Sequence, residues 1–161
     1  MTEDGIKKKI LQFVTLLTSD MDAAAEMMAD GFAWENFLPD NVPFGGRYEG
    51  VAGMSRYFDQ LANSWEIGEL DIVEVIVSDD GRRCAAIGVE TNDKALSPGT
   101  RRDIAFVWIF KTDEDRHFTY VREYNDTRAM YQAFVIAFGW FAPSPQPLIR
   151  RRGRGACHER L

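Results

Sequence analysis

Hydrophobic side chains recur with the spacing of one helix face in three stretches of the chain, and each predicts an amphipathic helix. The first stretch covers residues 4–18, the second begins near Gly50, and the last covers residues 127–141. A shorter helix is predicted over residues 21–29, because a capping-box pattern precedes this run of good helix formers. The apolar positions of the two longest patterns are Ile6, Ile10, Phe13, Val14 and Leu17, and Val51, Met54, Tyr57, Phe58, Leu61 and Trp65.

After residue 66 the period of the pattern changes to two, which predicts β-strands. Four strands are expected over residues 69–78, 83–92, 102–112 and 117–126, with turn signals such as "DDGR" and "DEDR" between them. One more short strand, "FAWENF", precedes the Pro- and Gly-containing segment "NVPFGGRYEG". Short links between consecutive strands predict antiparallel neighbours.

This order of elements predicts an α+β fold, with helices gathered on one side of a mainly antiparallel sheet. A strongly curved sheet around a long helix leaves an apolar cavity at its open end, which is a common place for a ligand. One domain is expected over residues 1–141, followed by a Pro- and Arg-rich, disordered tail over residues 142–161.

The charge of the chain argues against a nucleic-acid-binding body. The net charge is −6, and residues 150–161 contain five arginines and one glutamate. Residues 1–149 therefore contain 14 basic and 24 acidic side chains, whereas phosphate contacts need clustered basic ones. The arginine-rich end is expected to be a solvated tail.

Neither a membrane segment nor a cofactor is expected. No apolar run approaches the length of about 18 residues that crosses a bilayer, and the charged first ten residues do not match a secretory signal, so we expect a cytoplasmic protein. Cys84 and Cys157 lack the spacing of a zinc site or a disulfide framework. His117 and His158 have no neighbouring metal-ligand or nucleophile pattern, so no metal is predicted.

The element order, "PFGGRYEG" before the third helix and "VREYNDT" at the end of the last strand resemble the SnoaL-like branch of the nuclear transport factor 2-like superfamily over residues 5–138. This superfamily includes ketosteroid isomerases, polyketide cyclases, limonene epoxide hydrolases and scytalone dehydratases. The resemblance implies a cone-shaped, curved sheet wrapped by helices, with a pocket at its wide end. It also implies a homodimer and a small hydrophobic or polycyclic organic ligand.

The resemblance to ketosteroid isomerase directs attention to the acids of residues 35–42, where that enzyme has its base. Asp40 is the nearest acid, and its alternative role is that of a turn residue in "PDN". Glu35 is either a pocket acid or the solvent-facing member of an alternating strand. Tyr48 is the side chain of "NVPFGGRYEG" expected to reach a ligand, and Tyr57 stands near the position of the supporting tyrosine of the isomerase. The first helix offers no tyrosine, which makes isomerase chemistry of that kind doubtful.

Aromatic side chains of the last two strands suggest either a pocket or an interface. Alternation places Tyr120, Arg122 and Tyr124 on one face of the last strand, opposite Glu123. If this face and that of Trp108 coincide and point inward, Trp108, Arg122 and Tyr124 line a pocket. The alternative is a dimer interface, where aromatic residues and arginine are enriched.

Asp126 is a weaker catalytic candidate, because it precedes the last helix and fits the role of an N-cap. The favoured function is a small-molecule pocket, in which an enzyme would catalyse a cofactor-independent isomerisation, cyclisation, dehydration or hydrolysis by carboxylate acid-base chemistry. The alternative is a non-catalytic ligand-binding or dimerisation module. A carboxylate that points into an enclosed apolar cavity, within reach of a hydrogen-bond donor, would favour the enzyme.

Overall fold

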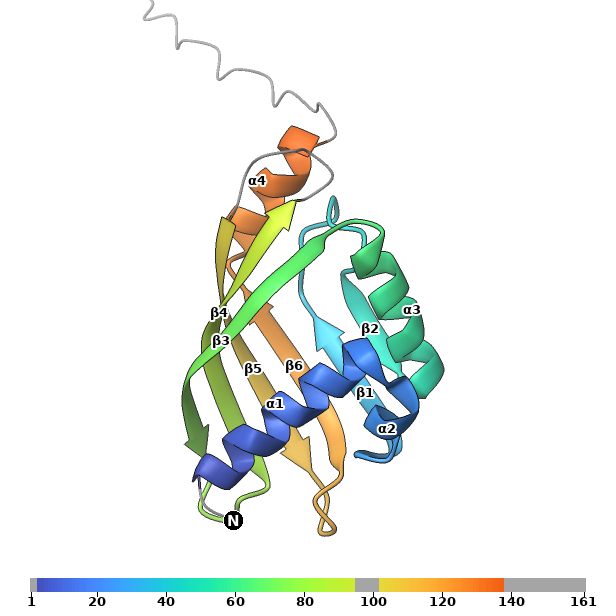
Figure 1. Ribbon diagram of the computed structural model, residues 1–161, viewed down its shortest axis with the longest axis vertical. Coiled ribbons are helices and arrows are strands. Elements are labelled where there is room, and N and C mark those ends of the chain that lie inside the picture. The colour runs from blue at the N-terminus through green and yellow to red at the C-terminus, as the bar shows by residue number, and fades with distance from the viewer. Residues whose placement is uncertain (1–2, 95–101, 138–161) are drawn as a thin grey trace, which may run out of the picture.

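The computed structural model describes residues 3–94 and 102–137 and has the predicted α+β architecture (Figure 1). The predicted break at residues 96–100, the domain end at residue 141 and the tail lie outside the described residues. None of the described helices is both long enough and apolar enough to cross a membrane. The elements are α1 (Glu3–Ser19), α2 (Met21–Ala25), β1 (Met28–Asn36), β2 (Gly46–Glu49), α3 (Gly50–Ala62), β3 (Glu66–Val77), β4 (Arg83–Lys94), β5 (Arg102–Thr112), β6 (Phe118–Asn125) and α4 (Thr127–Ala137).

The six strands form one mixed sheet in the order β2-β1-β6-β5-β4-β3. The four strands predicted from the period-two pattern are confirmed as β3 to β6, and each pairs antiparallel with the next. The parallel pair is β1 with β6, so the first strand of the sequence lies beside the last described strand. The sheet curves and does not close.

The helices α1 and α3 cover the concave face of the sheet (Figure 1). The predicted apolar stripe of α1 supplies core residues, and Phe13 packs against Phe32 of β1 and Phe118 of β6 with ring centroids 5.8 and 4.6 Å apart. The short helix α4 lies at one end of the sheet, where its Phe134 stacks on Trp65 at 5.4 Å. The other face of the sheet has no described helix over it.

The second helix is shorter than the pattern predicts. It ends at Ala25, and Met28 already belongs to β1. The reason is tertiary pairing, since Met28 lies opposite Phe118 of β6 and the Phe118 amide donates to the Met27 carbonyl at 2.8 Å. A hydrogen-bonded partner strand thus overrides the helix propensity of this run. The cap is Asp20, whose side chain accepts from the amide of Ala23.

Four of the ten residues of the segment "NVPFGGRYEG" form a strand that the sequence pattern did not predict. Residues 46–49 form β2 and pair antiparallel with β1. The buried Asn36 holds the two together, because its amide nitrogen donates to the Phe44 carbonyl at 3.1 Å and its oxygen accepts from the Gly46 amide at 2.8 Å. A buried side-chain amide therefore satisfies backbone groups on both sides of the turn into β2.

Candidate functional site

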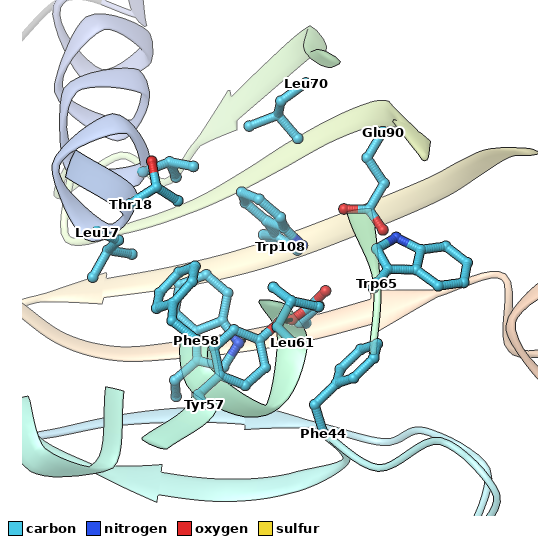
Figure 2. A pocket seen from close by; sticks show the side chains of 13 residues that line it. Leu17, Thr18, Phe44, Tyr57, Phe58, Leu61, Trp65, Leu70, Glu90 and Trp108 are labelled. Atoms are coloured by element: carbon cyan, nitrogen blue, oxygen red, sulfur yellow. Dashed lines mark hydrogen bonds between the residues drawn. The ribbon is translucent and has the colours of Figure 1, made fainter. Parts of the chain in front are cut away.

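An apolar cavity of about 70 Å³ lies between α1, α3 and the concave face of the sheet (Figure 2). Its walls are mostly aromatic, and its ionisable carboxylates come from β4 and β6. The lining side chains are Val14, Leu17, Thr18, Trp34, Phe44, Tyr57, Phe58, Leu61, Trp65, Leu70, Glu90, Trp108 and Glu123.

The wall against the sheet is built by three rings from three elements. Trp34 of β1 packs edge-on against Trp108 of β5, with centroids 5.6 Å apart. Trp34 also lies against Tyr57 of α3, with centroids 5.8 Å apart. All three side chains are at most 5% exposed, so this wall is well packed. The placement of Trp108 and Tyr57 in the lining agrees with their choice as ligand-contact candidates, while their contact with a ligand stays a prediction.

Glu123 is the buried acid of the cavity. It projects from β6, is 4% exposed, and accepts hydrogen bonds from three neutral donors. The Trp34 indole and the Tyr57 hydroxyl donate to Oε2 at 2.9 and 3.3 Å, and the Asn125 amide donates to Oε1 at 2.8 Å. No Lys, Arg or His side chain of the described residues forms a salt bridge with it. Glu123 is therefore a carboxylate that neutral groups hold inside an apolar cavity.

The pKa of the Tyr57 hydroxyl is raised by burial and by the negative charges of the cavity. Burial raises the pKa of Tyr57 well above its usual value, and the charges of Glu123 and Glu90 raise it further. Tyr57 therefore stays protonated and acts as a hydrogen-bond donor. In Figure 2 the Glu90 carboxylate projects from β4 toward Trp65.

Two indole N–H groups of the lining have no hydrogen-bond acceptor among the described residues. These are the Nε1 atoms of Trp65 and Trp108, each on a side chain that is 5% exposed. A buried donor without an acceptor costs about 1–3 kcal/mol, so both are available to an oxygen of a bound molecule.

The expected grouping of Trp108 with Arg122 and Tyr124 is corrected by the register of the last hairpin. Trp108 lies opposite Glu123, so these two share the inner face, while Arg122 and Tyr124 point to the outer face. The same strand contains a bulge, which changes the face on which Phe118 lies. Phe118 pairs with Thr112 and Tyr120 pairs with Lys111, so Thr119 is left unpaired in the ladder. Phe118 can then be buried together with Val121 and Glu123, although simple alternation places it with Arg122.

Glu35 lies on the outer face, where its carboxylate accepts hydrogen bonds from the Tyr120 hydroxyl and from Arg122 Nη2, the latter at 2.9 Å. These bonds, that of Tyr120 first, hold the pKa of Glu35 below its usual value. The Arg122 guanidinium also lies over the ring of Phe37, 4.9 Å from its centroid, and Phe37 stacks on Tyr124. Of the two roles left open for Glu35, its position is that of the solvent-facing member of the strand.

The remaining candidates lie outside the cavity lining. Asp40 is exposed in a turn closed by the Val42 amide and the Pro39 carbonyl, so its position fits a turn residue. Tyr48 is buried, and its hydroxyl donates to Gln60 Oε1 at 2.7 Å. Asp126 accepts from the amides of Arg128 and Ala129 and caps α4. A catalytic or binding role of these residues stays a prediction.

Glu123 is the functional candidate that sequence reasoning missed. Two features of the sequence could have identified it. Glu123 is an acid two residues after Val121, so both lie on the same face of the strand, and alternation places this face opposite the one that carries Arg122. The sequence does not say which face turns inward, so this acid was assigned no role. The criterion of an inward carboxylate within reach of a donor is met, by a residue other than those predicted.

Comparison with solved structures shows the fold of this chain. A nuclear transport factor 2-like protein from Burkholderia xenovorans has a TM-score of 0.70 at 19% identity, over 83% of this chain and 98% of that chain. A putative isomerase from Bacillus subtilis has a TM-score of 0.66 at 19% identity, over 83% and 96% of the two chains.

A putative SnoaL-like polyketide cyclase from Shewanella denitrificans has a TM-score of 0.58 at 15% identity, over 79% of this chain and 94% of that chain. No protein-family model and no curated protein matches the sequence. These likenesses establish the nuclear transport factor 2-like fold, and the activity has to be argued from the cavity.

Proposed function

We propose that the cavity binds a small organic molecule and that Glu123 transfers a proton to or from it, without a cofactor. The observation that carries the proposal is the Glu123 carboxylate, which is 4% exposed in an apolar cavity and within 3.3 Å of the Tyr57 hydroxyl. The function is then that of an isomerase, cyclase, dehydratase or hydrolase that works by acid-base chemistry. The structural relatives described as isomerase and cyclase are compatible with this class.

The proposed step has its donors and acceptors in place. The Glu123 carboxylate takes a proton from a carbon next to a carbonyl group, and the electron pair of the broken C–H bond moves to the carbonyl oxygen. The free indole N–H of Trp108 supports the negative charge that develops there, because a preorganised donor in a dry site stabilises an oxyanion. The proton returns from Glu123 to another atom of the ligand, so no cofactor is consumed.

The size of the cavity limits the ligand or requires movement. Its volume of about 70 Å³ is smaller than the roughly 150 Å³ of an engineered apolar cavity that takes up benzene. The half-buried Phe58 lies edge-on to Tyr57, with centroids 5.1 Å apart, and lines the cavity from α3. A rotation of Phe58 toward solvent enlarges the site for a ligand that contains a ring.

A proton-transfer assay tests this proposal without knowledge of the substrate. A nitrobenzisoxazole loses a proton from carbon to a base, its N–O bond breaks, and a coloured phenolate forms. We expect Phe58→Ala, which enlarges the cavity, to catalyse this reaction, and Phe58→Ala with Glu123→Gln to lose a factor of about 100 or more in kcat/KM. The measurement is the initial rate of phenolate formation.

The matched control is Phe58→Ala with Glu35→Gln, which removes a carboxylate of the outer face and should keep the rate. Equal rates for the Glu123→Gln variant and its parent would refute acid-base catalysis by Glu123. Uptake of the probe, followed by fluorescence quenching of the cavity tryptophans, together with equal rates would favour the alternative of a non-catalytic binding module.

We also propose that the chain forms a homodimer through the outer face of the sheet. This face has no described helix over it, yet it carries a band of apolar side chains across β3, β4 and β5. Ile76 is 54% exposed and pairs with Ala85, which pairs with Ile109, and Ile109 lies opposite Arg122. Apolar positions where an antiparallel sheet normally faces water with polar residues favour a protein partner.

A further inference from the structure

The rings around the cavity offer a binding surface for a positive charge. Six of the lining side chains are aromatic: Trp34, Phe44, Tyr57, Phe58, Trp65 and Trp108. The faces of aromatic rings are electronegative and attract cations within about 6 Å, and Trp does so most strongly. The rings come from the strands β1 and β5, from α3 and from segments before and after α3, so they surround the space instead of forming one wall.

The charges of the lining have one sign. Its ionisable groups at neutral pH are the carboxyl groups of Glu90 and Glu123, and none of the described lining residues is Lys, Arg or His. Besides burial, the charges of both glutamates raise the pKa of the Tyr57 hydroxyl, so both carboxylates act on the part of the cavity beside this hydroxyl.

The charge of Glu123 needs a counter-charge inside the cavity. Its three hydrogen bonds come from an indole, a phenol and an amide, which are neutral groups. Neutral donors solvate a buried carboxylate but do not cancel its charge, and buried charges are normally paired. A neutral ligand would leave the charge of Glu123 without a counter-charge, whereas a cation would supply one.

The indole N–H of Trp108 adds a second requirement. It lies on a side chain that is 5% exposed, and no group within residues 3–94 and 102–137 accepts from it. A ligand that satisfies it carries a hydrogen-bond acceptor beside its positive charge.

We propose that the cavity binds a small organic cation, an alkylammonium ion that also carries a hydroxyl or carbonyl oxygen. The aromatic rings and Glu123 hold the ammonium group, and the Trp108 N–H donates to the oxygen. The proposal rests on the cavity of the proposed function and names the class of molecule that enters it.

The test compares choline with its carbon isostere dimethylbutanol, which has the same shape and hydroxyl group without the charge. Titration calorimetry on the full chain should give choline an affinity at least about tenfold higher. The same comparison in Phe58→Ala, whose cavity is larger, keeps the test decisive if Phe58 blocks entry.

Two variants separate the contributions of charge and hydrogen bond. Glu123→Gln should weaken choline by about tenfold or more and leave dimethylbutanol unchanged, whereas Glu74→Gln, at an exposed position of β3, should change neither. Trp108→Phe removes the N–H donor and should weaken both compounds, because both have the hydroxyl group; choline should lose at least as much as dimethylbutanol, because Trp attracts a cation more strongly than Phe does.

The proposal is overturned if choline and its isostere bind with equal affinity, or if neither binds to the wild type or to Phe58→Ala. It is also overturned if Glu123→Gln retains the preference for choline and is folded by circular dichroism. Proton transfer from the neutral nitrobenzisoxazole does not depend on this preference. Loss of the cation preference with an intact reaction would therefore leave the proposed function standing.

Discussion

At the scale of single residues, Glu35 and Glu123 show how neighbours assign different roles to the same side chain. They lie on the adjacent strands β1 and β6, on opposite faces of the sheet. Glu35 is paired with the cationic Arg122 beside solvent, while Glu123 has neutral donors inside an apolar cavity. A carboxylate stabilised in its charged form is a poor base, which argues against Glu35 as the acid-base group.

The hydrogen bond from Tyr120 is the largest cause of the lowered pKa of Glu35, which predicts the effect of Tyr120→Phe. The pKa of Glu35 should rise toward its usual value of 4.5 without reaching it, because Arg122 still donates to the carboxylate. An NMR titration of the side-chain carboxyl carbon measures this shift. Tyr124→Phe is the control, since its hydroxyl contacts Arg122 and not Glu35.

The hydrogen bond between Tyr120 and Glu35 also determines how the stability of the protein changes with pH. A carboxylate whose pKa is lowered by folding contributes stability that is fully present above its unfolded pKa, near 4.5, and is lost as the pH falls through the lower folded pKa. The wild type should therefore lose more stability below pH 4.5 than Tyr120→Phe does. An unchanged titration of Glu35 in Tyr120→Phe would contradict this account.

At the scale of elements, the close contact between α3 and β2 positions the cavity wall that carries Tyr57. Gly53 makes this contact possible, because a Cβ atom at this position would lie 2.9 Å from the backbone carbonyl carbon of Tyr48. The pair is further held by Tyr48, whose ring packs edge-on against Tyr57 at 5.1 Å. The first turn of α3 thus sets the distance between the helix and the sheet.

This contact predicts that Gly53→Ala destabilises the protein. Alanine normally favours a helix by about 1 kcal/mol over glycine, but forced overpacking against backbone costs about 1–3 kcal/mol. We expect a net loss in the free energy of unfolding, measured by urea denaturation. Ser55→Ala, at an exposed position of the same helix, should be neutral or slightly stabilising. A Gly53→Ala protein more stable than the wild type would show that β2 and α3 can separate at no cost.

At the scale of the whole molecule, the two faces of the sheet have different surroundings. The concave face and its helices enclose the cavity, whereas the outer face presents the band of Ile76, Ala85 and Ile109 beside the cluster of Glu35 and Arg122. The proposed dimer buries this outer face and leaves the cavity intact. Assembly and ligand binding are then separable by mutation.

Val107→Lys tests this separation, because Val107 lies between Ile87 and Tyr124 in the middle of the outer face. We expect the variant to be monomeric at concentrations where the wild type is dimeric, since a lysine cannot be desolvated there without a partner. Analytical ultracentrifugation measures the change. Val51→Lys, at a 39% exposed position on α3, is the matched control and should leave the assembly unchanged. A monomeric wild type would refute the dimer.

The sequence by itself determined the elements and the class of fold. Helical and strand periods are local properties, so α1, α3 and the strands β3 to β6 could be predicted from the spacing of apolar residues alone. Pairing partners are not local, which is why the start of β1 was predicted as helix and β2 as loop. Asp126 as a cap of α4 was also accessible, because a cap depends on its neighbours in the chain.

The tertiary structure alone decided which acid belongs to the cavity. The alternation along β6 separates Arg122 from Glu123, but two faces related by a shift of one residue are equivalent in sequence. The bulge at Thr119 and the pairing of Trp108 with Glu123 select the inner face. The physical reason is that burial results from packing between distant segments, here β6 against α3 and β1, and no local pattern contains that information.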